Sequence, residues 1–141
     1  MILKFIEINF GILGMLFILR HGETEWNTLL KRQGQKNSPL TDKGKEQAKK
    51  MAKAIRNIKK DLKNYKMLVS PLGRTIETSN IIIDELDFDR ENVIIEDLLK
   101  EISFGDFEGI PKPEIKKLYP EEEKKQSEDP WAYVYPNGES F

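Results

Sequence analysis

The sequence predicts an α/β fold, because short apolar runs and helical patterns alternate along the chain. Apolar runs at residues 15–19, 67–69 and 92–95 are short enough for strands and end at charged, polar or turn-forming residues. Between them, two longer stretches carry apolar residues at helical spacing. Chains of this kind bury the apolar face of a sheet under helices.

Composition limits the chemistry available to the chain. Its 141 residues are enough for one domain with a real core, and its formal net charge is −1. It has no cysteine and one histidine, which excludes disulfides, thiolate catalysis and a His-rich metal site. We expect a cytoplasmic protein that needs no metal or organic cofactor. Nothing in the composition predicts an oligomeric state.

The first nineteen residues are mostly apolar, but they do not read as a membrane span or a signal peptide. Polar residues interrupt the run at positions 4, 7 and 9, and no small-residue cleavage site is evident. Alternation of apolar and polar residues over 6–10 predicts an additional strand. We treat 1–14 as an extension of unknown role and 15–141 as the domain, and expect no membrane partner.

The run at 15–19 predicts a buried strand, and Arg20, His21 and Gly22 follow it directly. In open α/β sheets, ligands bind beyond the carboxyl ends of the strands. Arginine offers a fork of donors that matches phosphate oxygens, and neutral imidazole is a nucleophile that can form covalent intermediates. The pair therefore suggests phosphoryl chemistry, although a lone histidine is more often a surface or hydrogen-bonded core residue.

A helix is predicted from Thr41, which can act as its N-cap, with Asp42 favourable in the first turn. Its apolar positions follow helical spacing: Ala48, Met51, Ala52 and Ile55. Many lysines and an arginine between 43 and 66 raise the possibility of nucleic-acid binding. Because no aromatic residues are interleaved with them, we interpret this region as a solvated helix face and expect no nucleic-acid partner.

A second helix is predicted after the strand at 67–69. Ser70 is suited to the N-cap and Pro71 to the first helical position, with apolar residues continuing to Ile82. This places Arg74 in the first turn, where its guanidinium and the free backbone N–H groups can both address an anion.

The third predicted strand leads into an acidic segment. A glutamate beside a phosphate site can protonate a leaving alkoxide. On chemistry alone the candidates are equivalent: Glu96, Asp97, Glu101, Asp106 and Glu108. A short helix is predicted at 113–119, followed by acidic residues 121–123 and a loop to Trp131. Trp131, Tyr133 and Tyr135 could line a pocket, but packing is the commoner role of aromatic residues.

Five motifs in order resemble the histidine phosphatase superfamily, the phosphoglycerate mutase-like enzymes. They are Arg20-His21-Gly22-Glu23-Thr24 with Trp26-Asn27, Ser38-Pro39-Leu40-Thr41 with Gly44, Ser70-Pro71-Leu72-Gly73-Arg74-Thr75, the segment 101–109, and Pro136-Asn137-Gly138-Glu139-Ser140. The resemblance covers residues 16–141. It implies a three-layer α/β/α sandwich with a mostly parallel sheet, incomplete at the C-terminus.

The resemblance also implies roles for individual residues. His21 would be the nucleophile, and Glu101 would match the acid–base glutamate, with Glu108 as the rival to test. Arg20 and Arg74 would hold the phosphoryl group, and Asn27 would assist them. Gln33 and Gly34 occupy, by spacing, the loop that contacts substrate in the family.

The function implied is hydrolysis of a small-molecule phosphate ester through a phosphohistidine. The short segment between 113 and 131 favours a phosphatase over a phosphoglycerate mutase, which is the first alternative. The second histidine that family members carry is absent from this sequence. A noncatalytic fragment that binds phosphate is therefore the second alternative.

Overall fold

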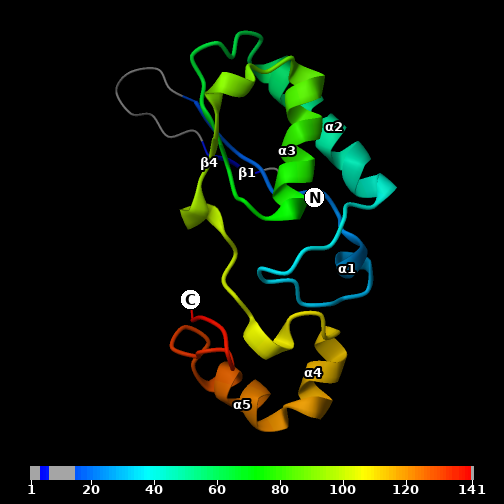
Figure 1. Cartoon of the computed structure of the whole chain (residues 1–141), viewed down its shortest axis with the longest axis vertical. Helices are drawn as coiled ribbons and strands as arrows, with labels where there is room; N and C mark the ends of the chain where they lie inside the picture. Colours follow the sequence, from blue (N-terminus) through cyan, green and yellow to red (C-terminus); the bar gives the residue numbers. More distant parts are fainter. Residues whose placement is uncertain (1–3, 7–14, 141) are drawn as a thin grey trace.

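The computed structural model describes residues 4–6 and 15–140, with only the backbone described at 4–6. Figure 1 shows one end of the molecule built from helices α2 and α3 with the strands, and the other end built from α4, α5 and the C-terminal segment. The strands are β1 (Lys4–Ile6), β2 (Leu16–Ile18), β3 (Met67–Val69) and β4 (Val93–Ile95). The helices are α1 (Glu25–Thr28), α2 (Asp42–Ile58), α3 (Gly73–Leu86), α4 (Lys112–Leu118) and α5 (Pro120–Glu128).

The described strands form two separate two-stranded sheets. β3 and β4 pair in parallel, with Leu68 opposite Ile94, as expected for strands joined through a helix. β1 pairs antiparallel with β2, with Phe5 opposite Phe17. A strand thus forms at 4–6, which shares only residue 6 with the range 6–10 predicted for an additional strand, and the rest of that range lies outside the described residues.

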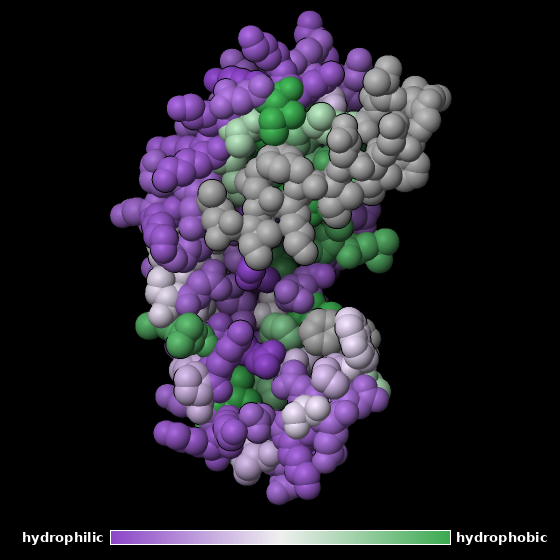
Figure 2. All heavy atoms as spheres, turned by 180° about the vertical axis from the view of Figure 1, so that it is seen from behind, coloured by the Kyte–Doolittle hydropathy of each residue, from purple (hydrophilic) through white to green (hydrophobic). Residues whose placement is uncertain are grey.

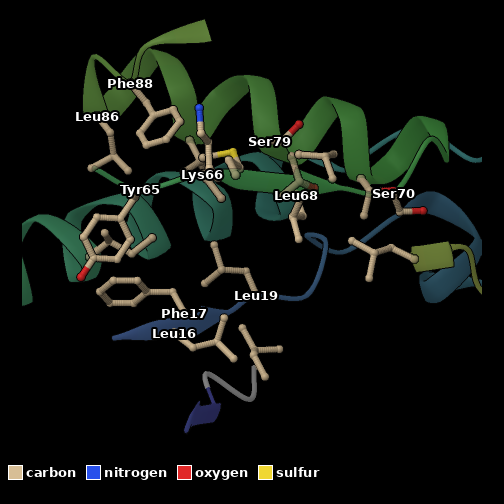
Figure 3. A pocket seen from close by; sticks show the side chains of 18 of the residues that line it. Leu16, Phe17, Leu19, Tyr65, Lys66, Leu68, Ser70, Ser79, Leu86 and Phe88 are labelled. Atoms are coloured by element: carbon tan, nitrogen blue, oxygen red, sulfur yellow. The ribbon is translucent and has the colours of Figure 1, made fainter. Parts of the chain in front are cut away.

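A cavity of about 490 Å³ lies between β2 and β3. Side chains from both strands and from α3 line it, and Figure 3 shows Leu16, Leu19, Leu68 and Leu86 around it. Arg20 and His21 also line the cavity. The α/β class that the sequence predicts is confirmed by the helices and by the parallel pair of β3 and β4, and the described strands form two sheets with the cavity between β2 and β3.

The prediction that the run at 15–19 is buried was wrong, although its strand is confirmed. Leu16 and Ile18 are each 46% exposed, and Leu68 on β3 is 56% exposed. Since β2 has a hydrogen-bonded neighbour on β1 only, one side of the strand is left without a partner among the described residues. Figure 2 shows hydrophobic residues gathered in the upper half of the molecule, on a surface that is otherwise largely hydrophilic.

Helix α2 is confirmed as the sequence predicts. The Thr41 hydroxyl accepts a hydrogen bond from the Gly44 N–H at 3.0 Å, and Asp42 lies in the first turn. The predicted apolar face is buried and packs against α3, where Ile82 completes the cluster. Its lysines are on the exposed side. No helix in the described part of the chain is long and apolar enough to cross a membrane.

Helix α3 begins two residues later than predicted. Its first residue is Gly73 and its N-cap is Leu72, which makes no side-chain cap hydrogen bond. The Ser70 hydroxyl accepts only a long hydrogen bond from the Leu72 N–H, at 3.5 Å, which closes a local turn instead of capping the helix. A side chain at Gly73 would overlap the amide group of Asn37, so this glycine allows the helix start to pack against the neighbouring loop. Arg74 remains in the first turn, as predicted.

The second core lies at the other end of the molecule. Phe107, Ile115, Tyr133 and Tyr135 are buried together there, which confirms packing for both tyrosines, whereas Trp131 is 76% exposed. The predicted helix at 113–119 is found as α4. The loop predicted after it is instead α5, because Pro120 suits the first turn and three glutamates at 121–123 complement the positive end of the helix.

Candidate active site

The loop that carries His21 is fixed to α2 and to α3. The Gly22 N–H donates to the Thr78 hydroxyl at 3.1 Å, and that hydroxyl donates to the Arg74 carbonyl at 2.7 Å. A side chain at Gly22 would overlap the backbone carbonyl of Gly44 in the first turn of α2, so only glycine permits this approach. The loop is therefore placed by α3, which carries Arg74 in its first turn, and by the start of α2.

The His21 ring has a defined tautomer. Its Nδ1 lies 2.8 Å from the carbonyl oxygen of Gly22. Because a carbonyl can only accept, Nδ1 must carry the proton, and Nε2 is the unprotonated nitrogen when the ring is neutral. The geometry thus provides a nucleophilic nitrogen without a separate general base.

The environment of His21 favours the neutral ring. Its pKa is lowered, mainly because burial penalises the charged imidazolium, and the positive charges of Arg74 and Arg20 lower it further. The hydrogen bond to the Gly22 carbonyl acts in the opposite direction. The ring is therefore neutral in a larger fraction of molecules near pH 7 than an ordinary histidine.

Arg74 is buried, with only 4% of its surface exposed. Its Nη2 donates to the Gly34 carbonyl at 2.9 Å and its Nη1 to the Lys36 carbonyl at 3.2 Å. Its Nε is buried and has no hydrogen-bond partner among the described residues. Burial lowers the pKa of the guanidinium, and the carboxylate of Glu101 opposes that effect. A guanidinium group is suited to binding an anion such as phosphate.

Arg20 and Asn27 complete the first motif. Arg20 is exposed and lines the same cavity as His21. The Asn27 carbonyl oxygen of the side chain accepts from the Thr24 N–H at 3.0 Å, while the Asn27 N–H donates to the Thr24 hydroxyl at 3.2 Å. This reciprocal capping box starts α1 and fixes the Asn27 amide with its NH₂ group directed away from Thr24.

Gln33 and Gly34 lie in the loop before α2, and both are buried. The Gln33 amide donates to the Thr24 hydroxyl at 2.6 Å, so its NH₂ group is used inside the protein. Gly34 has φ +53°, a backbone conformation that favours glycine, and its carbonyl is the one that binds Arg74. In this structure the two residues support the loop and Arg74.

Glu101 lies on an exposed segment beside this loop. The Gln35 amide donates to the Glu101 carbonyl at 3.2 Å, and the Ile102 N–H donates to the Glu101 carboxylate at 3.1 Å. Its charge acts on Arg74. The structure thus brings His21, Arg20, Arg74 and Glu101 into one electrostatic site.

Glu108, the rival carboxylate, is buried and occupied by protein donors. Its Oε1 accepts from the Gln35 N–H at 2.9 Å, from the Phe104 N–H at 3.0 Å and from the Ser103 hydroxyl at 3.3 Å. Its Oε2 accepts from the Lys36 N–H at 3.2 Å. These contacts place Glu108 among the supports of the site.

Two supports of the site were not identified from the sequence. Thr78 lies one helical turn after Arg74, a spacing that predicts the contact with the Arg74 carbonyl but not the contact with Gly22. Glu139 accepts from the Ser103 N–H at 2.7 Å and from the Gln35 amide at 3.3 Å. Its place in the last of the five motifs is the one signal that singles it out.

No group of three or more histidine, cysteine or acidic side chains in residues 15–140 is placed to hold a metal ion. The arrangement consists of an unprotonated ring nitrogen, two guanidinium groups and a carboxylate open to solvent. Such a set can bind a phosphoryl group and exchange it between the ring nitrogen and an oxygen.

Known proteins resemble this chain in sequence. The sequence profile of the histidine phosphatase superfamily (branch 1) matches residues 16–141. A phosphoserine phosphatase of Hydrogenobacter thermophilus is 33% identical over 126 residues, which are 89% of this chain and 56% of the relative. A probable phosphoglycerate mutase of Enterobacter sp. (strain 638) is 38% identical over 108 residues, 77% of this chain and 46% of the relative.

A solved structure agrees with the sequence comparisons. The α-ribazole phosphatase of Shigella flexneri matches with a TM-score of 0.72 at 29% identity, over 87% of this chain and 57% of that protein. The chain spans about half the length of these relatives. The profile match, the identities and the shared α/β fold agree with the motif order, and the chain belongs to the histidine phosphatase superfamily, branch 1.

Proposed function

We propose that the chain carries the phosphoryl-transfer site of a phosphomonoester hydrolase, in which His21 is the nucleophile. The observation that carries the proposal is the hydrogen bond of Nδ1 to the Gly22 carbonyl, at 2.8 Å. It assigns the proton to Nδ1 and leaves Nε2 to attack. The lowered pKa of His21 supports the same role.

The first step transfers the phosphoryl group to His21. Nε2 forms a bond to phosphorus in line with the ester oxygen, and the bond between phosphorus and that oxygen breaks. Arg74 and Arg20, with the amide of Asn27, hold the remaining oxygens. Glu101 gives its proton to the leaving alkoxide, so the alcohol departs neutral. Gln33 and Gly34 contribute the loop that borders the bound group.

The second step regenerates the enzyme. Water attacks phosphorus, Glu101 takes a proton from it, and the bond between Nε2 and phosphorus breaks to release orthophosphate. Glu101 suits this exchange because its side chain is on an exposed segment, whereas Glu108 is held by four protein donors. None of these steps needs a metal or an organic cofactor.

The substrate we propose is a small-molecule phosphate ester. Two relatives are named as a phosphoserine phosphatase and an α-ribazole phosphatase. The substrates in these names are small phosphate monoesters. A cytoplasmic location, and independence from nucleic acid and membranes, stay predictions of the sequence.

Hydrolysis of p-nitrophenyl phosphate by the wild-type chain and by His21→Ala tests the proposal. The wild type should release p-nitrophenol and orthophosphate, and the alanine variant should release neither above background. Equal rates in the two proteins would overturn the assignment of His21.

A phosphoglycerate mutase is the second candidate, favoured by the relative from Enterobacter at 38% identity. In that case the phosphohistidine would return its phosphoryl group to a bound sugar acid instead of water. Conversion of 3-phosphoglycerate that depends on 2,3-bisphosphoglycerate would identify it. Binding of orthophosphate without either reaction would identify the third possibility, a noncatalytic phosphate-binding chain.

A further inference from the structure

Glu108 stands at the junction of two segments that the site depends on. One is the loop 34–36, and the other is the segment 101–104, which carries Glu101. The carboxylate accepts backbone N–H groups from both: Gln35 and Lys36 on the loop, and Phe104 on the other segment. Gln35 and Lys36 lie 73 and 72 positions from Glu108 in the sequence, so the carboxylate joins its own part of the chain to a loop that is distant in sequence.

The loop in turn holds Arg74. The carbonyls of Gly34 and Lys36 accept from its two terminal nitrogens, at 2.9 and 3.2 Å. The Gly34 carbonyl belongs to the same peptide unit as the Gln35 N–H that Glu108 binds, and the Lys36 carbonyl lies on the unit next to that of the Lys36 N–H. A peptide unit is planar, so fixing its N–H fixes the direction of its carbonyl. The orientation of the guanidinium therefore depends on the carboxylate, although the terminal nitrogens of Arg74 donate to the Gly34 and Lys36 carbonyls and not to Glu108.

The loop also holds the segment of Glu101. The Gln35 amide donates to the Glu101 carbonyl at 3.2 Å, while the backbone N–H of the same residue is bound by Glu108. Gly34 packs directly against the carboxylate, because a side chain there would overlap Oε1 of Glu108. The buried carboxylate of Glu108 thus fixes the position of the loop relative to both Arg74 and Glu101.

We infer that Glu108 is a positioning residue, which aligns Arg74 with Glu101 by holding the loop 34–36 against the segment 101–104. It acts through these groups and does not exchange a proton with the substrate. The expected effect of Glu108 on phosphate binding rests on the proposed function, whereas its expected effect on the loop 34–36 does not.

Two substitutions at this position give a graded test. Glu108→Ala removes every acceptor. Glu108→Gln keeps one oxygen for the three donors at Oε1 and places an NH₂ group toward the Lys36 N–H, which then has no acceptor. Asp106→Asn is the matched control, because it makes the same chemical change two residues away, on an exposed carboxylate bound to the Asn137 amide.

The first measurement is backbone amide hydrogen exchange by NMR in the absence of any phosphate. The Lys36 N–H should exchange at least tenfold faster in Glu108→Gln, and the Gln35, Lys36 and Phe104 N–H groups should all do so in Glu108→Ala. The Lys45 N–H, which donates to the Thr41 carbonyl at 2.9 Å, reports any general loss of stability. Unchanged protection of Lys36 in both variants, or equal acceleration at Lys45, would overturn the positioning role.

The second measurement is the dissociation constant of orthophosphate, by calorimetry. Misalignment of Arg74 should weaken binding about tenfold in Glu108→Ala and less in Glu108→Gln, while Asp106→Asn should match the wild type. Full affinity in Glu108→Ala, with the loop amides exposed, would contradict the link to Arg74. If the wild type itself binds no orthophosphate, the proposed function fails, and the exchange measurement still decides the role of Glu108.

Discussion

The backbone N–H of Gly22 donates to the hydroxyl of Thr78 at 3.1 Å, so the loop of His21 is tied to the helix of Arg74. The nucleophile and the buried cation are 53 positions apart in the sequence, from 21 to 74. Thr78 makes them neighbours by binding Gly22 on one side and the Arg74 carbonyl on the other, at 2.7 Å.

Replacing Thr78 by valine should therefore impair both stability and phosphoryl transfer. Valine keeps the shape but leaves the Gly22 N–H without an acceptor, which costs about 1–3 kcal/mol in a buried place. Thr78→Ser should restore most of the loss. Thr75→Val is the control, because the Thr75 hydroxyl donates to the Leu72 carbonyl of its own segment and does not join two segments. Urea unfolding and phosphohistidine yield measure the two effects, and equal losses at 75 and 78 would contradict the tie.

Glycine at position 22 should be required by packing. In Gly22→Ala the new methyl group meets the backbone carbonyl of Gly44, which cannot rotate away as a side chain could. We expect a loss of about 1–3 kcal/mol in the free energy of unfolding, typical of overpacking. Gly44→Ala should show a similar loss, because its methyl group meets the Glu23 backbone. A Gly22→Ala protein as stable as the wild type would show that the loop does not pack on α2.

The pH dependence of His21 follows from its lowered pKa. The free ring nitrogen is lost as pH falls, so phosphohistidine formation should decline with a midpoint below 6.5. The unfolded chain binds its proton first as pH falls, so unfolding free energy should also decrease from about pH 6.5 downward, until the folded ring is protonated as well.

Titration by proton NMR measures this pKa directly, because the chain has one histidine and hence one imidazole signal. Burial is the main cause of the shift, and Arg74 and Arg20 add to it. In Arg20→Met, the loss of one positive charge should move the midpoint upward without restoring the full ordinary value. A wild-type midpoint at 6.5 or above would contradict the environment described for the ring.

Arg74→Lys should show that shape matters as well as charge. Lysine retains the positive charge, but its three N–H groups share one nitrogen, so it does not reproduce the planar fork whose two terminal nitrogens bind the Gly34 and Lys36 carbonyls. We expect orthophosphate binding at least tenfold weaker, measured by calorimetry. The control is Arg90→Lys, an exposed arginine paired with Asp84 at 2.7 Å, which should leave binding unchanged. Full affinity in Arg74→Lys would mean that charge is sufficient.

Sequence patterns predicted correctly the secondary-structure elements that depend on residues close together in the sequence. Thr41 and the apolar positions after it predicted α2 correctly. An N-cap residue and a helical spacing of apolar residues are both features of residues close together in the sequence. Ser70 and Pro71 carried the same kind of signal, yet α3 starts at Gly73, where the chain packs against Asn37 from another loop. The burial of Leu16 and Ile18 also depends on distant strands, and the pattern predicted it wrongly.

The same distinction holds for the site. His21, Arg74 and Glu101 could be chosen because family motifs mark them. Three hydrogen bonds could be identified only from the folded chain. They join Nδ1 of His21 to the Gly22 carbonyl, the Gly22 N–H to Thr78, and the Gln35 N–H to Glu108. Hydrogen bonds between residues more than fifty positions apart leave no periodic pattern in a single sequence.

Trapping the phosphorylated protein tests the central claim most directly. The wild type and His21→Ala would be treated with p-nitrophenyl phosphate, quenched in alkali, where phosphohistidine survives, and analysed by peptide mass spectrometry. Our account predicts one phosphoryl group on His21 in the wild type and none in the variant. A phosphoryl group found on another residue, or retained in His21→Ala, would contradict it.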